Sequence, residues 1–139
     1  MKTIRILILE DDLKTLAVLL DKISKLEDDL ISKNCGDIAV TVLSEYTQVE
    51  EYINKLEKPD FDIILLDRDC KAGGSFHVLN LDKFNKDKIV SISSVPEYNE
   101  AAKNMGIGKI VWKDYDNLEK FADKVISEIK TIFSYIKAD

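Results

Sequence analysis

The sequence predicts an α/β fold: a five-stranded, doubly wound parallel sheet covered by helices on both faces. Two observations carry this prediction. Apolar runs of strand length alternate five times with segments of helical periodicity, and this alternation favours parallel strands joined by right-handed crossovers. The run at 63–66 has no polar interruption, which is typical of a strand buried on both faces. With 139 residues, 45% of them hydrophobic and 33% charged, the chain is expected to form one domain, 1–139.

The first half of the chain is predicted to form two strand–helix units. Residues 4–9 are a strand, and from there apolar residues recur at spacings of three and four, which predicts a helix over 13–33. Residues 38–43 alternate between two faces, as expected of a half-covered strand at the edge of the sheet. Thr47, with a glutamate three residues later, has capping-box spacing and predicts a short helix that ends before Pro59.

The second half is predicted to continue the same alternation after the buried strand at 63–66. Ser75 caps a short helix that runs through Leu81, and residues 88–93 form the fourth strand. Ser94 has capping-box spacing to a glutamate and is followed by a proline, so a helix is expected from there to Gly106. The fifth strand is expected at 109–113. The last helix follows it, capped at 116–117 and apolar on one face from 118 nearly to the end of the chain.

Polar side chains follow four of the five predicted strands at their carboxyl ends. Glu10 and Asp11 follow the first strand, Asp67 the third, and Ser93 and Lys113 end the fourth and fifth. The strand order 2-1-3-4-5 puts the edge-like second strand at a border and makes a switch point between the first and third strands, where sheets of this kind bind ligands. The sequence therefore predicts a site at this edge, with Asp67 as the reactive group.

Each of these residues also has an ordinary structural explanation. Glu10, Asp11 and Asp12 are suited to the start of the following helix, and Asp12 is expected to cap it. Asp67 and Asp69 are common loop-capping residues, and a lysine at a strand end is most often solvated. Convergence of three carboxylates at one edge, however, is costly without a cation. Mg²⁺ suits such a set, because it prefers oxygen ligands.

Taken together, these strand ends resemble the receiver domain of bacterial two-component response regulators, which has a flavodoxin-like (βα)5 fold. The resemblance rests on Glu10-Asp11, Asp67, Ser93 and Lys113, each on the strand that the family requires, and it covers residues 4–127. It implies that a histidine kinase or phosphotransfer protein transfers a phosphoryl group to the protein, which then acts on an unknown downstream protein.

The same resemblance implies a role for each residue of the site. Asp67 would be the phosphoacceptor. Mg²⁺ would be held by Asp11, Asp67 and the backbone carbonyl of Asp69, and Glu10 would reach the ion through water. Ser93 and Lys113 would contact the phosphoryl oxygens. The protein would then have no enzymatic activity beyond its own Mg²⁺-dependent phosphorylation and dephosphorylation.

Three positions depart from the family pattern. Cys70-Lys71 stand where the family usually has Met-Pro, and Asp114 replaces the proline that usually follows the lysine. Ile110 occupies the position of the aromatic switch residue in the fifth strand. These departures favour phosphoacceptance over the usual switching mechanism, so that switching is expected to involve Ser93 and the helix after it.

Two other functions remain as alternatives. The motif Asp67-Arg68-Asp69 is similar to the nucleophile motif of haloacid-dehalogenase-type phosphatases, but here the acidic pair comes first and no insertion could form a substrate cap. The second alternative is a pseudo-receiver that binds partners without phosphorylation. The altered loop favours it, whereas the presence of all five polar positions does not.

Composition excludes further classes of function. The net charge of −6 and a pI near 4.9 argue against direct nucleic-acid binding. No apolar run approaches the length of a membrane span, and the amino terminus has no cleavage site of a signal peptide. A cytoplasmic protein without a membrane segment is therefore expected.

Overall fold

The computed structural model describes residues 2–68 and 70–138, with side chains through Ser134. Its centre is a five-stranded parallel sheet in the order β2-β1-β3-β4-β5, which confirms the predicted fold class and strand order. The strands are β1 (Lys2–Leu9), β2 (Gly36–Leu43), β3 (Ile63–Leu66), β4 (Ile89–Ser93) and β5 (Lys109–Trp112). The edge position of β2 is also as predicted.

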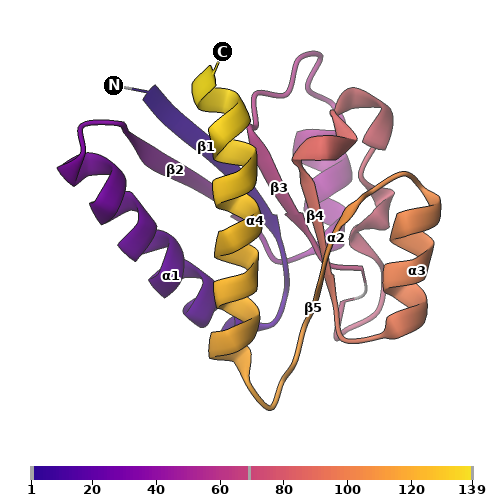
Figure 1. Cartoon of the computed structure of the whole chain (residues 1–139). Helices are drawn as coiled ribbons and strands as arrows, with labels where there is room; N and C mark the ends of the chain where they lie inside the picture. The colour runs from indigo at the N-terminus through magenta and orange to yellow at the C-terminus, as the bar shows by residue number, and fades with distance from the viewer. Residues whose placement is uncertain (1, 69, 139) are drawn as a thin grey trace.

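Helices cover both faces of the sheet (Figure 1). Helices α1 (Leu13–Ser32) and α4 (Leu118–Ala138) lie side by side on one face, and α2 (Tyr46–Gln48) and α3 (Pro96–Asn104) belong to the other. Alternate residues of β1 supply the two layers: Ile6 and Ile8 pack under α1 and α4, whereas Leu7 and Leu9 pack on the opposite side. Because both faces are buried there, β3 and the second half of β1, residues 6–9, are apolar without interruption.

The helix predicted between the third and fourth strands does not form. Three short 3₁₀ helices replace it, at Phe76–Val78, Leu81–Lys83 and Lys86–Lys88. Ser75 caps the first of them as predicted, since its hydroxyl oxygen accepts the N–H of His77. Asn80 and Asn85 accept the N–H two residues ahead of them, and such local side-chain bonds compete with a continuous helix.

Two further predicted caps are wrong, and another is confirmed. Helix α2 begins before Thr47 and passes into one π-helical turn, Val49–Ile53, so the threonine is no cap. The N-cap of α3 is Val95 rather than Ser94, and Pro96 occupies the first helical position. At α4, Asn117 accepts the N–H of Lys120 as predicted. Capping-box spacing was therefore insufficient where a neighbouring residue could begin the helix.

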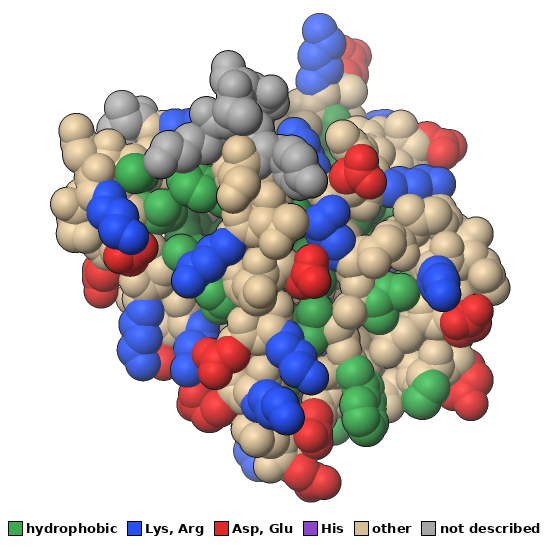
Figure 2. Space-filling view, in the orientation of Figure 1, with side chains coloured by type: hydrophobic (Ala, Val, Ile, Leu, Met, Phe, Trp, Pro, Cys, Tyr) green, Lys and Arg blue, Asp and Glu red, His purple; other side chains and the backbone are tan. Residues whose placement is uncertain are grey.

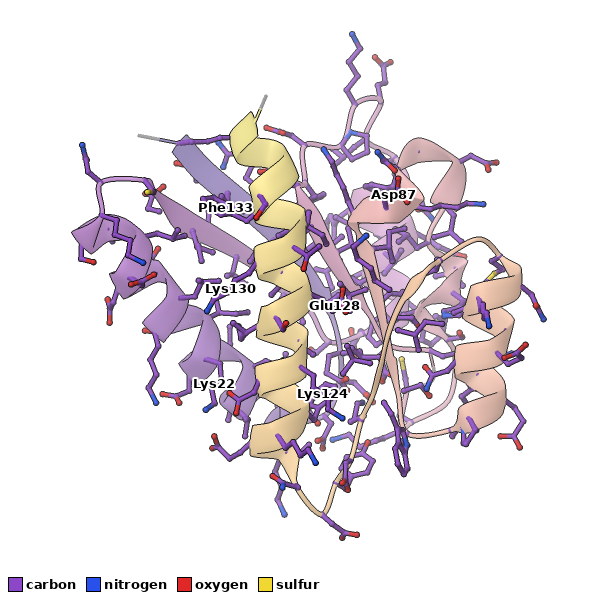
Figure 3. All side chains as sticks on the ribbon, viewed as in Figure 1. Lys22, Asp87, Lys124, Glu128, Lys130 and Phe133 are labelled. Carbon is purple, nitrogen blue, oxygen red and sulfur yellow. The ribbon has the colours of Figure 1, made fainter. Side chains whose placement is uncertain are left out.

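The long helices α1 and α4 contact each other. Lys22 lies between them, 2.9 Å from the Glu119 carboxylate and 3.1 Å from that of Asp123. Figure 3 shows Lys22 and Lys130 between the two helices, and Phe133 near the end of α4. The lengths of the two helices predict that Leu26 or Leu30 packs against Phe133 or Ile136. Phe133 packs against the core cluster that contains Leu26 and Leu30, and the side chain of Ile136 lies outside the described residues.

The surface over α1 and α4 carries both signs of charge. Figure 2 shows Lys and Arg side chains interspersed with Asp and Glu side chains on this face. Such a mixture offers no continuous basic track for a phosphate backbone. In the described ranges 2–68 and 70–138, no helix is both long and apolar enough to cross a lipid bilayer.

The last turns of α4 are expected to stabilise the fold. Ile132 is buried against the α1–α4 core, so Ile132→Ala should lower the free energy of unfolding by about 2–5 kcal/mol in urea denaturation. The neighbouring Thr131 is exposed, and Thr131→Ala should change it by less than about 0.5 kcal/mol. Equal effects of the two substitutions would show that this end of α4 does not pack on the core.

Candidate functional site

The predicted site residues meet at the carboxyl edge of the sheet. Backbone hydrogen bonds continue past the ends of the strands and fix their positions: the N–H of Asp67 donates to Leu9 (3.0 Å) and that of Lys113 to Ser93 (2.9 Å). Glu10 is joined to the end of β2 through Leu43, which accepts its N–H at 3.4 Å. Four strands therefore hold the site, and none of these residues depends on a loop for its place.

Four of the polar side chains are buried. The exposed fractions are 0% for Glu10, 6% for Asp67, 3% for Ser93 and 2% for Lys113. The Lys113 ammonium donates to Glu10 Oε2 at 2.6 Å and lies 3.4 Å from Asp67 Oδ2. One ammonium therefore serves two buried carboxylates, and the solvated strand-end lysine considered from the sequence is excluded.

This arrangement shifts two pKa values. Burial and the nearby Glu10 carboxylate raise the pKa of Asp67 to about 7, against the opposing effects of the Lys113 ammonium and the N–H of Arg68. Burial lowers the pKa of Lys113, but attraction to Glu10 and Asp67 outweighs it and leaves that pKa above its ordinary value. The lysine therefore stays charged, and two buried carboxylates share its one positive charge.

The other acidic residues after β1 have separate roles. Asp12 caps α1, because its carboxylate accepts both the N–H and the hydroxyl of Thr15, as predicted. Burial opposes these two bonds, yet they keep the pKa of Asp12 below its usual range. Asp11 accepts the N–H of Lys71 at 2.5 Å, and Glu10 accepts that of Asp12 at 3.0 Å. The cap therefore uses Asp12, and Glu10 and Asp11 remain at the site.

Three carboxylates of the site fit a divalent cation. One oxygen from each of Glu10, Asp11 and Asp67 lies within 4.8 Å of the others. Such a set of hard oxygen donors suits Mg²⁺ or Mn²⁺, and a cation would relieve the repulsion from Glu10 that, after burial, raises the pKa of Asp67. The backbone carbonyl of Asp69, predicted as a further ligand, lies outside the described residues.

Two aromatic contacts beside the site were not predicted. The guanidinium of Arg68 lies 4.2 Å from the centre of the Tyr98 ring, and the Lys113 ammonium lies 5.5 Å from that of Tyr115. The first contact links the loop after β3 to α3. Its two residues are thirty positions apart and share no motif, so the sequence carried no signal for it.

The raised pKa of Asp67 makes stability depend on pH. In the unfolded chain the pKa of this carboxyl has its ordinary value of 3.8. The stability that its protonated form contributes to the folded state is therefore fully present below about pH 4 and is lost as the pH rises to about 7. Without divalent cations, Asp67→Asn should therefore raise the melting temperature at pH 8 and leave it nearly unchanged at pH 4. Differential scanning calorimetry at both pH values measures the effect.

Asp116→Asn, on an exposed residue, is the control and should give no such difference in melting temperature. A lower melting temperature of Asp67→Asn at pH 8 would contradict the electrostatic account.

Comparison with known proteins identifies the fold. No family model and no curated protein matches the sequence. Among solved structures, the bacteriophytochrome response regulator AtBRR is 20% identical, covering 89% of this chain and 93% of its own, with a TM-score of 0.57. The Mn²⁺-bound form of response regulator Rcp1 is 17% identical, covering 88% and 91%, with a TM-score of 0.64. An orphan response regulator of H. pylori, HP1043, is 18% identical, covering 90% and 95%, with a TM-score of 0.50. The chain therefore has the fold of response regulator receiver domains.

Proposed function

We propose that the protein is a phosphoacceptor response regulator, in which Asp67 receives a phosphoryl group from a histidine kinase or phosphotransfer protein. One observation carries the proposal: the Lys113 ammonium lies beside two buried carboxylates at the edge of the sheet where Asp67 ends the central strand. A purely structural ion pair would need only one of these carboxylates. The strand order supports the proposal, since it places Asp67 at the switch point.

The transfer is a displacement at phosphorus. A carboxylate oxygen of Asp67 attacks the phosphohistidine, an O–P bond forms as the N–P bond breaks, and the imidazole leaves and takes up a proton. Such transfers require mainly positioning and compensation of charge. Lys113 offers a charged ammonium to the phosphoryl oxygens. Ser93 accepts the N–H of Val95 at 3.1 Å, which leaves its own hydroxyl proton available for a phosphoryl oxygen.

Mg²⁺ would be held at this site by Asp11 and Asp67, with Glu10 acting directly or through water and the Asp69 carbonyl as a further ligand. When bound, the ion compensates the negative charge that the carboxylates and the phosphoryl group bring together. The carboxylate grouping supports this assignment, and the structural neighbour Rcp1 is described as Mn²⁺-bound. Lys113 alone cannot compensate three carboxylates and an incoming phosphoryl group.

The proposal has consequences for partners and location. A response regulator of this kind acts in the cytoplasm through contact with a downstream protein, with residues 1–139 as one receiver domain. It needs no enzymatic activity beyond its own phosphorylation and dephosphorylation. The alternative of a phosphorylation-independent module gains from one observation, because the Lys113 ammonium lies closer to Glu10 than to Asp67. No such observation supports the alternative of a haloacid-dehalogenase-type phosphatase.

Phosphorylation can be tested with small donors. Incubation with acetyl phosphate or phosphoramidate and Mg²⁺ should add one phosphoryl group, detected by intact mass spectrometry. Asp67→Asn should abolish the product, whereas Asp69→Asn should permit it and change only its lifetime, because that substitution keeps the backbone carbonyl. Labelling that survives Asp67→Asn would identify a different acceptor. Wild-type protein that binds Mg²⁺ but accepts no phosphoryl group from these donors or from a cognate kinase would support the pseudo-receiver alternative.

The metal requirement is a separate prediction. Asp11→Ala removes one carboxylate of the site, so labelling at low Mg²⁺ should fall while excess Mg²⁺ restores it in part. Asp12→Ala serves as the matched control, because Asp12 is committed to the cap of α1 and should affect melting temperature more than Mg²⁺ dependence. The comparison uses the Mg²⁺ concentration that gives half-maximal labelling. Identical values for the two variants would exclude Asp11 as a ligand.

Switching should involve α3. This helix has a single buried side chain, Ala102, and its start is tied to Ser93 through Val95. Because few apolar contacts hold it, phosphorylation should change amide hydrogen exchange within residues 93–106. Helix α1, which is anchored by six buried residues, should exchange unchanged and provides the internal reference. A change confined to β5 would be inconsistent with this mechanism.

A further inference from the structure

Within residues 2–68 and 70–138, no strand pairs with the outer edge of β2. This strand has eight residues and pairs on one side only, with β1, over its whole length. Residues 39–42 are all exposed, although they alternate between the two faces of the sheet. Neither α1 nor α2 therefore covers the middle of the strand. A second strand could approach this edge from the side without displacing either helix.

The edge also lacks the features that usually prevent strands from pairing. Proteins protect edge strands with lysine, proline, bulges or short length. Residues 38–43 contain no charge and no proline, and the pairing of β2 with β1 runs without a bulge from Gly36 to Leu43. The one charge of the strand, Asp37, lies at its start. Val40 and Val42 are each 37% exposed, so pairing would also bury apolar surface.

Backbone geometry identifies which groups face outward. The C=O of Leu43 accepts the N–H of Glu10 and so points toward β1. Backbone directions alternate along a strand, so the groups of Ile38, Val40 and Val42 point away from the sheet. The Glu27 carboxylate already accepts the N–H of Ile38 at 2.8 Å. In the described part of the chain, Val40 and Val42 thus present two N–H and two C=O groups without partners.

We propose that β2 pairs with β2 of a second copy of this chain, antiparallel and about a two-fold axis at Thr41. Val40 then faces Val42 of the second copy, and each of the two donates its N–H to the C=O of the other. By symmetry, Val42 pairs in the same way with Val40 of the second copy. All four outward groups of each copy are satisfied, and the Glu27–Ile38 bond stays intact. The two sheets become one continuous sheet, and the interface is isologous, as in most homodimers.

The surroundings of the strand fit this register. A shallow hollow of about 160 Å³ lies between α1 and β2, lined by Leu20, Ile23, Ser24, Glu27, Ile38 and Val40. In the proposed pairing, Val42 of the second copy lies opposite Val40 and therefore beside this hollow. A two-fold axis at Val40 is disfavoured. In that register the Ile38 N–H would have to donate to the second copy, but it already donates to the Glu27 carboxylate.

Symmetry favours a second copy over a foreign strand. The exposed residues 39–42 carry no charge that would select a partner of opposite sign, whereas the outward groups of Val40 and Val42 are self-complementary about Thr41, so a second copy supplies matching partners. Antiparallel pairing keeps the two Asp37 carboxylates at opposite ends of the interface. Each end still brings Asp37 near Glu45 of the other copy, so the dimer should strengthen as salt screens this repulsion.

Disulfide trapping tests the register. In a Cys35→Ser, Cys70→Ser background, Thr41→Cys puts two thiols opposite each other at the axis, in a non-hydrogen-bonded pair about 4.5 Å apart between Cα atoms, which suits a disulfide. Mild oxidation should then give a cross-linked dimer on a non-reducing gel. Ala39→Cys is the matched control: the two thiols lie four residues out of register, about 13 Å apart along the strand, and should not cross-link. Cross-linking of both variants to the same extent, or of neither, would overturn the proposed pairing.

Sedimentation velocity tests the dimer without a cross-link. Unphosphorylated wild-type protein should show a concentration-dependent monomer–dimer equilibrium that shifts toward dimer at higher salt. Val42→Lys should shift it to monomer with an unchanged melting curve of the monomer, whereas Thr131→Lys, on exposed α4, should leave it unchanged. Wild-type protein that stays monomeric at every concentration, or a dimer that survives Val42→Lys, would refute the proposal. Neither outcome depends on phosphorylation, so the proposed function is tested separately.

Discussion

The Lys113 ammonium shared by Glu10 and Asp67 is the interaction on which the site depends. Burial of an ion pair has a desolvation cost, and here two carboxylates meet one ammonium, so the metal-free arrangement is under electrostatic strain. The sheet supports it, because each of the three residues follows a strand at whose end a ladder hydrogen bond fixes the backbone. A rigid apolar sheet thus holds together charges that repel each other in the absence of a cation.

The same constraint explains which parts of the fold the sequence predicted. Strands that must be buried on both faces need apolar runs, which are unbroken in β3 and in residues 6–9 of β1 and are interrupted in β4 only by the small Ser91. Once parallel pairing follows from the alternation with helices, the residues after each strand must meet at one edge. Glu10, Asp67 and Lys113 could therefore be grouped from the sequence, although they are spread over more than a hundred positions.

The third helix and the cap of α3 were predicted wrongly because local side-chain hydrogen bonds compete with the expected ones. Asn80 and Asn85 bond to their own backbone and divide the expected third helix into 3₁₀ turns, which an apolar pattern cannot reveal. Ser93 accepts the Val95 N–H, which gives the turn before α3 its own side-chain bond without Ser94. The Arg68–Tyr98 contact could not be predicted for another reason, because it depends on how the loop after β3 lies against α3 in the folded chain.

If Asp67 accepts a phosphoryl group as proposed, that contact would connect it to α3 in place of an aromatic switch residue. Ile110 cannot act as an aromatic switch, but Arg68 follows Asp67 directly and its guanidinium lies on Tyr98 in the first turn of α3. The backbone of Arg68 is fixed, since its carbonyl accepts both the N–H of Phe76 and the hydroxyl of Ser75. Movement is therefore confined to the side chain. A phosphoryl group on Asp67 would compete with the ring for this guanidinium, because charge-assisted bonds to phosphate are stronger than a cation–π contact. Helix α3, in which only Ala102 is buried, would lose one of its contacts when the site gains charge.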